Sequence, residues 1–180
     1  MTRLKFLTLA MACGALASFA VQVAHAQLRI DAHAGAVQTV QGALGARSGF
    51  AARGDAGAAA GRRGLVADGQ GNVDAAAASG FTTAGGAQGG RSARFSRSAD
   101  GSATASANAS ASGQNGSADR SGTYTRNADG SASAQRQTTL TNANTGTTFD
   151  GSTTYTKGSG FSRTGSCKDA AGNSVTCGSR

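Results

Sequence analysis

The sequence predicts a mainly β protein, built as an antiparallel meander of repeated hairpins with two strands in each repeat of about 30 residues. A nine-residue phrase at 95–103 recurs at 124–132 with six identical positions, and each copy runs from an aromatic residue into Asp-Gly. Pairs of turn-forming residues also recur at regular intervals from residue 68 onward. A β-solenoid is the alternative that the same repeat allows.

The first 26 residues predict a secretory signal peptide. A positively charged start precedes an apolar segment over 7–23, and Ala24-His25-Ala26 matches a cleavage site. The alternatives are an uncleaved membrane anchor and, because of Cys13, a lipoprotein. We therefore expect an exported protein that begins at Gln27 and has no membrane span after cleavage. It would reside in the periplasm, on the cell surface or outside the cell.

The next segment, 27–64, is predicted to be a low-complexity arm that is partly helical or disordered. Val37, Val40 and Leu44 have the spacing of one helical face, although glycines between them weaken a helix. The glycines at the end of the segment are typical of a linker. The chain thus divides into the signal peptide, this arm with its linker, and a repeat region over 65–180.

The repeat region has the alternating pattern of strands. Over 102–112, alanine alternates strictly with serine, threonine or asparagine, which places five alanines on one face of a strand. Asp-Gly and Asn-Gly pairs are strong hairpin signals, and they separate about seven such strands. The predicted turns are Asp68-Gly69, Gly85-Gly86, Asp100-Gly101, Asn115-Gly116, Asp129-Gly130, Asn144-Thr145-Gly146, Gly158-Ser159-Gly160 and Ala171-Gly172-Asn173.

Large apolar residues are scarce after the signal peptide. Leu, Ile, Val and Phe account for 15 of the 154 residues from Gln27 onward, about half of the fraction below which disorder is expected. The chain is therefore either largely disordered or ordered by backbone ladders and closely packed small residues. The absence of proline favours order, because disordered linkers are usually enriched in it.

The mature chain is basic. From Gln27 onward it has 15 Lys and Arg residues against nine Asp and no Glu, a net charge of +6. A basic surface favours polyanions such as DNA, lipopolysaccharide or acidic polysaccharide. Simple solubility is the alternative explanation.

Three aromatic residues are each followed, two positions later, by an arginine. The aromatic residues Phe95, Tyr124 and Phe161 precede Arg97, Arg126 and Arg163. Residues two apart share a face of a strand, so we expect rings and guanidinium groups to lie beside each other in adjacent strands. These six residues are the predicted polyanion-binding site. The alternative is that the rings cover alanine and the arginines keep the sheet soluble.

Two cysteines remain after the predicted cleavage, Cys167 and Cys177, with a turn sequence between them. Folding about Gly172 places them opposite each other across a hairpin, within reach of a disulfide. An exported protein with an even number of cysteines favours oxidation. Metal binding is the alternative, but no further ligands complete a site.

The residues that usually carry catalysis are missing. His33 is the single histidine after the predicted cleavage, Glu is absent, and most Asp residues fall in predicted turns. No acid–base pair or activated nucleophile is evident, and the Asp-Gly turns lack the register of a calcium-binding repeat. We therefore expect no enzyme activity, metal or cofactor.

The expected function is structural: an exported repeat protein with a surface or matrix role, whose strands associate with copies of themselves. A polyanion-binding module that uses the aromatic–arginine residues is one alternative. A largely disordered secreted protein is the other.

Overall fold

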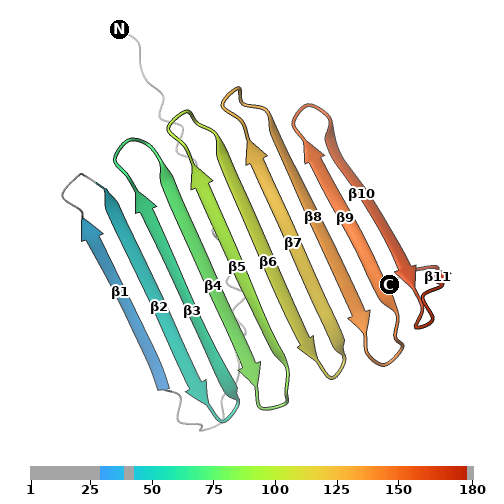
Figure 1. Cartoon of the computed structure of the whole chain (residues 1–180). Coiled ribbons are helices and arrows are strands. Elements are labelled where there is room, and N and C mark those ends of the chain that lie inside the picture. The colour runs from blue at the N-terminus through green and yellow to red at the C-terminus, as the bar shows by residue number, and fades with distance from the viewer. Residues whose placement is uncertain (1–28, 39–42, 178–180) are drawn as a thin grey trace.

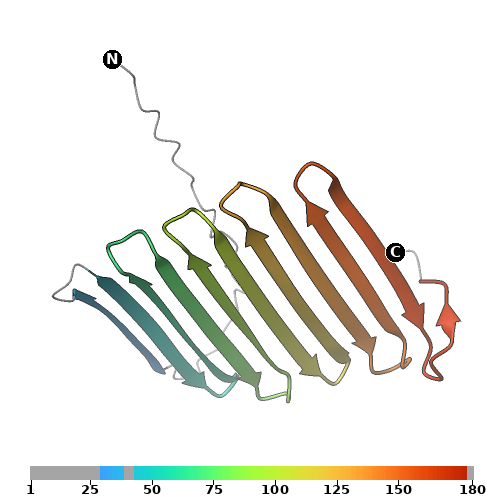
Figure 2. The same cartoon turned by 45° about the horizontal axis from the view of Figure 1, so that its top comes forward.

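The structure is a computed structural model that describes residues 29–38 and 43–177, and these residues form one antiparallel sheet in a single layer (Figures 1 and 2). Each strand pairs with the next along the chain, so the predicted meander is confirmed over the solenoid alternative. The described part contains no helix. The strands are β1 (Arg29–Gln38), β2 (Leu44–Gly54), β3 (Gly57–Ala67), β4 (Val73–Thr83), β5 (Gln88–Arg97), β6 (Ala103–Gly113), β7 (Gly116–Arg126), β8 (Ala132–Asn142), β9 (Thr148–Thr156), β10 (Gly160–Lys168) and β11 (Ser174–Val175).

All eight predicted turns join consecutive strands. The phrase repeated in the sequence is the end of one strand, a five-residue turn and the start of the next strand. In the turn after β5, Gly101 has a φ of 87°, and its amide donates to the Ser98 carbonyl at 3.0 Å. The turn after β7 repeats this bond between Gly130 and Asn127. Glycine is needed at these positions because other residues are strained at positive φ.

Aspartates hold four of these turns, each by accepting hydrogen bonds from residues that follow it. Asp100 accepts from the hydroxyl of Ser102 at 2.7 Å and from its amide at 2.8 Å, and these bonds lower the pKa of the Asp100 carboxyl. Asp129 accepts from the Ser131 amide at 2.8 Å. Hydrogen bonds from Ser131 lower the pKa of Asp129 likewise, and bonds from the side-chain amides of Asn72 and Asn173, with backbone amides, lower the pKa of Asp68 and Asp169. The acidic residues of the turns are thus explained by folding.

The prediction of a partly helical or disordered arm is wrong for its described residues. Strands β1, β2 and β3 cover most of 29–64, and β3 runs through the predicted boundary with the repeat region. The turn between β2 and β3 is Asp55-Ala56, followed by Gly57 at a φ of 140°. Residues 39–42 and the predicted signal peptide lie outside the described residues. The helical spacing failed because pairing in the sheet outweighed a weak local preference.

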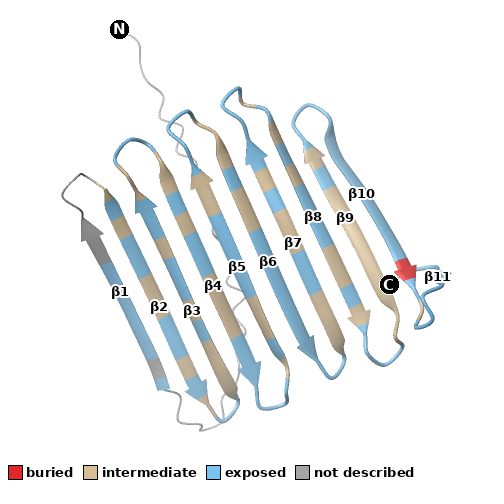
Figure 3. Cartoon of the chain, viewed as in Figure 1, coloured by how far each residue is buried: buried red, intermediate tan, exposed pale blue. Residues whose placement is uncertain are grey.

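The sheet has almost no core. Within the described residues, Cys167 is the one buried apolar side chain, at 7% exposure, and everything else is half-buried or exposed (Figure 3). A single layer leaves both faces open to solvent, and backbone pairing therefore carries most of the order. Low apolar content here accompanies an extended sheet and not a packed globule.

The predicted disulfide is confirmed. Cys167 and Cys177 are bonded, with 5.3 Å between their Cα atoms, and the bond closes the hairpin of β10 and β11. β11 pairs with only two residues of β10, Cys167 and Lys168. The cystine thus ties down the last strand at one edge of the sheet, where noncovalent contacts are few.

A candidate polyanion-binding face

The register of the strands sorts their side chains onto two faces, because residues directly opposite each other in antiparallel strands point to the same side. We call the side that carries Phe95 and Arg97 the arginine face, and the side that carries Ser96 the hydroxyl face. Phe95 is opposite Ala105 of β6, which is opposite Tyr124 of β7. The same row continues through β8 and β9 to Phe161 of β10.

The arginine face carries nearly all of the large apolar side chains. In β2–β11, Val66 is the one that lies on the hydroxyl face. Many of the others are exposed, and Phe161 reaches 72%. The twelve on the arginine face are Leu44, Phe50, Leu65, Val73, Phe81, Phe95, Tyr124, Leu140, Phe149, Tyr155, Phe161 and Val175.

Carboxylates are divided between the faces even more sharply, whereas arginines lie on both. The arginine face carries seven exposed strand arginines and no strand carboxylate, and the hydroxyl face carries five strand arginines together with all four aspartates of the described strands. The seven are Arg63, Arg91, Arg97, Arg120, Arg126, Arg136 and Arg163, the five are Arg29, Arg47, Arg53, Arg62 and Arg94, and the aspartates are Asp31, Asp74, Asp119 and Asp150. A face with one sign of charge attracts ligands of the opposite sign.

The centre of this face is a symmetrical site on three strands. On β5 and β7, arginine, a small residue, an aromatic ring and arginine follow one another at alternate positions. The strand between them, β6, presents five alanines and Gly113 to this face. We call Arg91, Arg97, Arg120 and Arg126 the arginine quartet, and the five residues Ala103, Ala105, Ala107, Ala109 and Ala111 the alanine strip. In the quartet, Arg97 and Arg126 flank Ala103, and Arg91 and Arg120 flank Ala109.

The dimensions of the site follow from strand geometry. β5 and β7 are two strand spacings apart, about 10 Å, and the arginines of one strand are six residues apart, about 20 Å. The rings of Phe95 and Tyr124 lie between the two ends on either side of Ala105. The site is therefore a long strip with a floor of small side chains, bordered by rings and guanidinium groups.

Four of the six residues predicted as a site are brought together: Phe95, Arg97, Tyr124 and Arg126. Arg163 shares their face but lies two rows away from Arg97, because β10 runs opposite to β5 and β7. The residue that continues the row of Arg97 and Arg126 is Lys157, whose ammonium donates to the Gly130 carbonyl at 2.7 Å. Phe161 instead packs on Tyr155, with ring centroids 4.8 Å apart.

Sequence reasoning missed two members of the quartet, Arg91 and Arg120. The signal was present, because Arg-Ser at 91–92 recurs at 120–121, the same 29-residue shift that relates Phe95 to Tyr124. The conserved spacing extends the repeat upstream of the ring by four residues. Residues four apart in a strand also share a face, and the strand register adds that Arg91 and Arg120 flank the same alanine, Ala109.

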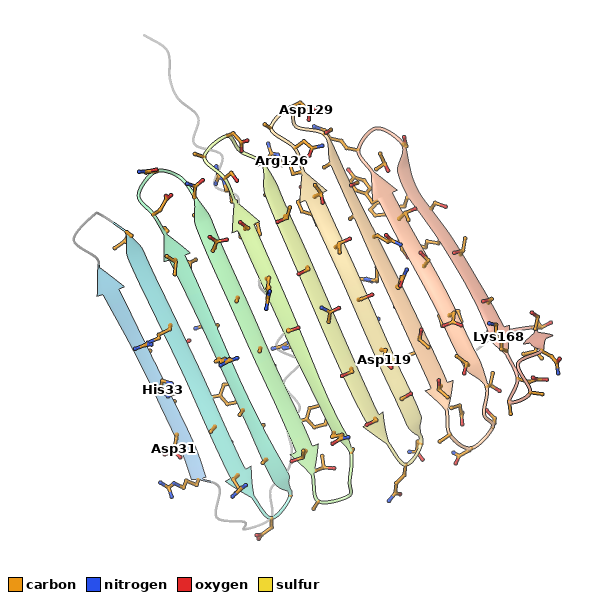
Figure 4. The ribbon with its side chains drawn as sticks, viewed as in Figure 1. Asp31, His33, Asp119, Arg126, Asp129 and Lys168 are labelled. Atoms are coloured by element: carbon orange, nitrogen blue, oxygen red, sulfur yellow. A yellow bond between two sulfur atoms is a disulfide. The ribbon has the colours of Figure 1, made fainter. Side chains whose placement is uncertain are left out.

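The quartet arginines are free to meet an anion. In the described part of the chain, the one ion pair joins Arg29 to Asp31 at 3.4 Å, and neither residue belongs to the arginine face. Arg91 Nε donates to the Ser79 hydroxyl at 3.0 Å, which aligns the side chain across the neighbouring strand. Arg126 lies at the end of β7, and Asp119 lies farther down the same strand on the other face (Figure 4). Guanidinium groups without carboxylate partners can make bidentate bonds to phosphate or carboxylate.

Aromatic rings outside the quartet cover glycines of neighbouring strands. A Cβ placed on Gly61 would come within 2.5 Å of the Phe50 ring, and one on Gly89 within 2.7 Å of the Phe81 ring. The Phe149 ring lies against both Gly151 and Gly165 in the same way. These rings shield backbone that glycine leaves bare. Their role in folding is therefore separate from the role of the quartet.

The described residues hold no group of three or more His, Cys, Asp or Glu side chains that could bind a metal ion. His33 lies on the hydroxyl face of β1, where its ring would lie 3.0 Å from a Cβ placed on Gly49. No helix in the part of the chain that the structure describes is long and apolar enough to cross a membrane. No protein-family model, curated protein or solved structure matches this chain.

Proposed function

We propose that this chain is an exported, non-enzymatic protein whose arginine face binds an acidic polymer. The observation that carries the proposal is the separation of charge: seven strand arginines and no strand carboxylate share one face. The hydroxyl face also carries strand arginines, five in number, but there they share the face with all four strand aspartates. A polymer with phosphate or carboxylate groups is the ligand that this face would attract.

The shape of the site supports an extended ligand over a small one. The quartet spans about 20 Å along the strands, which matches roughly six stacked nucleotides at 3.4 Å each. The alanine strip between β5 and β7 lets a polymer backbone approach the sheet closely. Phe95 and Tyr124 offer stacking surfaces for bases or sugar rings.

The proposal is tested by binding of fluorescent single-stranded DNA to the mature protein over a range of salt concentrations. Replacement of the quartet by alanine should weaken binding strongly, and it should reduce the salt slope of log K by about three, since each phosphate contact contributes about 0.7. The matched control replaces four arginines of the hydroxyl face, Arg47, Arg53, Arg62 and Arg94, and so removes the same charge. Equal losses in both variants would show that net charge, and not the arginine face, binds the polymer.

Three further polymers identify the chemistry that the face selects. Polyphosphate offers anions alone, a uronic-acid polysaccharide offers carboxylates with sugar rings, and lipopolysaccharide offers phosphates on a lipid. Binding of polyphosphate as tight as that of DNA would assign recognition to the arginines alone. Tighter binding of DNA or polysaccharide would assign part of it to Phe95 and Tyr124.

A structural role at the cell surface or in a matrix is the second candidate function. It is supported by an eleven-stranded sheet in one layer with strand edges that the described residues leave unpaired. Such edges are templates for pairing with another chain. The role is contradicted if the purified mature protein stays monomeric and binds no amyloid dye at high concentration. Far-UV circular dichroism of the same sample checks the strand content that both candidates require.

A further inference from the structure

We propose that β10 of one copy pairs with β1 of the next copy, so that successive molecules form one continuous antiparallel sheet. This inference rests on the structural role proposed above and names its partner, a second copy of the chain. β1 and β10 lie at opposite edges of the sheet (Figure 1), and Asp31 and His33 mark the β1 edge in Figure 4. β1 runs antiparallel to β2, and the alternation continues to β10, so β10 and a following β1 are antiparallel as well.

Both edges have free backbone among the described residues. β11 covers only Cys167 and Lys168 of β10, which leaves the outer side of 160–166 unpaired. β1 pairs with β2 and with no other described strand. Neither edge carries proline, the free segment of β10 has Arg163 as its single charge, and β1 has Arg29 and Asp31, which pair with each other at 3.4 Å. The usual devices that blunt an edge are therefore few.

Continuing the rows of the sheet across the junction pairs 160–166 with 31–37 of the next copy and brings compatible side chains together. Arg29 and Ile30 lie beyond this stretch, at the level where β11 already pairs with β10, and would not join the ladder. On the arginine face, Phe161 would be opposite Ala36 and Arg163 opposite Ala34 of the next copy. This repeats the pattern inside the sheet, where alanines of β4, β6 and β8 alternate with the larger residues of β5, β7 and β9. Phe161 is the most exposed of the large apolar side chains that the structure describes, so its open side is available to a neighbouring strand.

The hydroxyl face continues in the same register. One row there reads Ser110, Asp119, Thr139, Asp150 and Ser166, so that hydroxyl groups and carboxylates alternate from β6 to β10. Within this row the Thr139 hydroxyl donates to Asp150 at 2.8 Å. The residue of the next copy that would face Ser166 is Asp31. The alternation thus extends across the junction to Asp31, and the new pair of Ser166 with Asp31 places a carboxylate beside a hydroxyl donor.

Self-pairing of the β10 edge is disfavoured by charge. The free segment 160–166 is centred on Arg163, and full overlap with its own copy would place two Arg163 side chains directly opposite each other. Like charges in that position destabilise a pair of strands. Pairing between different edges also leaves a free edge at each end of the product, so assembly grows as a filament and does not stop at a dimer.

Disulfide trapping in the mature protein tests the register. One variant carries His33→Cys and another Thr164→Cys, two positions that would be directly opposite across the junction, with Cβ atoms about 5 Å apart. Mixing and mild oxidation should give a 33–164 cross-link, identified by peptide mapping. The matched control combines Ala34→Cys with Thr164→Cys, which is one residue out of register and on the other face, and should not link. A link formed by His33→Cys alone would show that β1 pairs with itself and would overturn the proposal.

A charge test and the size of the assembly complete the experiment. Ala34→Glu should lower the concentration at which assemblies appear, and Ala34→Arg should raise it, each by up to about fivefold, because residue 34 would face Arg163. Sedimentation of the unsubstituted mature protein should show species that lengthen with concentration. Assemblies without the 33–164 link, or growth that ends at a dimer, overturn edge pairing while leaving the structural role. A protein that stays monomeric and binds no amyloid dye overturns both.

Discussion

The two faces of the sheet share one backbone and differ in almost everything else. The arginine face holds twelve large apolar side chains and seven arginines, and the hydroxyl face from β6 to β10 is serine, threonine, asparagine, glutamine, aspartate, lysine and one glycine. Because successive residues point to opposite sides, a period of two in the sequence separates large apolar side chains from carboxylates in space, although the hydroxyl face of β2–β5 still carries Val66 and four arginines. One face therefore shields the backbone with rings and is the face that we propose binds a ligand, and the other face is polar from β6 to β10.

The largest expected difference between the faces is in stability. Phe149→Ala on the arginine face removes a half-buried ring that lies against Gly151 and Gly165, and should lower the free energy of unfolding by about 2 kcal/mol. Thr139→Val on the hydroxyl face removes the 2.8 Å bond to Asp150 and should cost less than about 1 kcal/mol. Urea unfolding followed by circular dichroism measures both. Equal costs would show that the two faces stabilise the sheet alike.

The next largest effect should come from stacking of DNA bases on Phe95 and Tyr124 of the arginine face. Replacement of Phe95 and Tyr124 by alanine should weaken binding of single-stranded DNA by about 2 kcal/mol, roughly thirtyfold, since each stacked base contributes about 1–3 kcal/mol. Polyphosphate, which has no rings, should bind almost unchanged. Ser96→Ala with Thr125→Ala is the control, because these neighbours on the same strands face the other side. An equal loss of affinity in the control variant would show that Phe95 and Tyr124 do not contact the DNA.

A single added carboxylate should weaken polymer binding on one face and not on the other, by a smaller free energy than the loss of the rings. Ala107→Asp places a negative charge in the alanine strip among the quartet, and should weaken polymer binding by about 1 kcal/mol, or fivefold. Asn108→Asp adds the same charge to the next residue of β6, on the hydroxyl face. Anisotropy with labelled DNA compares the two variants, which have equal net charge. Equal weakening would mean that the polymer does not lie along the strip.

The smallest effect concerns acid, and it acts on the turns and not on either face. Hydrogen bonds from Ser102 hold the pKa of Asp100 below its ordinary value of 3.8. The pKa values of Asp68, Asp129 and Asp169 are also lowered, by hydrogen bonds from the residues that follow them. A lowered pKa in the folded state stabilises the fold above the unfolded pKa, and this stabilisation is lost as the pH falls through the folded pKa. The turns should therefore loosen progressively below about pH 3.8.

Carbon-detected NMR titration of the Asp100 carboxyl measures this directly. The midpoint should lie below that of an unfolded peptide with the same sequence, and Ser102→Ala should move it upward by removing the hydroxyl donor at 2.7 Å. A midpoint at or above the peptide value would contradict the role given to these bonds.

The sequence determines the turns of this fold better than its strands. Asp-Gly and Asn-Gly locate the reversals in the repeat region, because positive φ is a local requirement that glycine meets at low cost. β1 to β3 were missed, since their alanines and glycines have no strand preference and Val37, Val40 and Leu44 imitate a helix. Those residues form strands because neighbouring strands pair with them, which a local pattern does not report.

The candidate site was predicted in part for a related reason. Phe95, Arg97, Tyr124 and Arg126 were found because the repeat is obvious at the turn that follows them. Arg163 was placed beside them by its spacing from Phe161, but spacing does not say in which direction a strand runs. Strand alternation alone places Arg91 and Arg120 on the face of the rings, but their position on either side of Ala109, 29 residues apart in the chain, required the register.

The claim that one face binds the polymer is tested most directly by chemical footprinting of arginine. The mature protein is treated with an arginine-selective dicarbonyl reagent, with and without single-stranded DNA at low salt, and modification is quantified by mass spectrometry at each site. We predict that Arg91, Arg97, Arg120 and Arg126 are protected by DNA, whereas Arg94, on the opposite face of the same strand as Arg91, reacts at an unchanged rate. Equal protection of Arg94 and its neighbours would contradict a face-specific site.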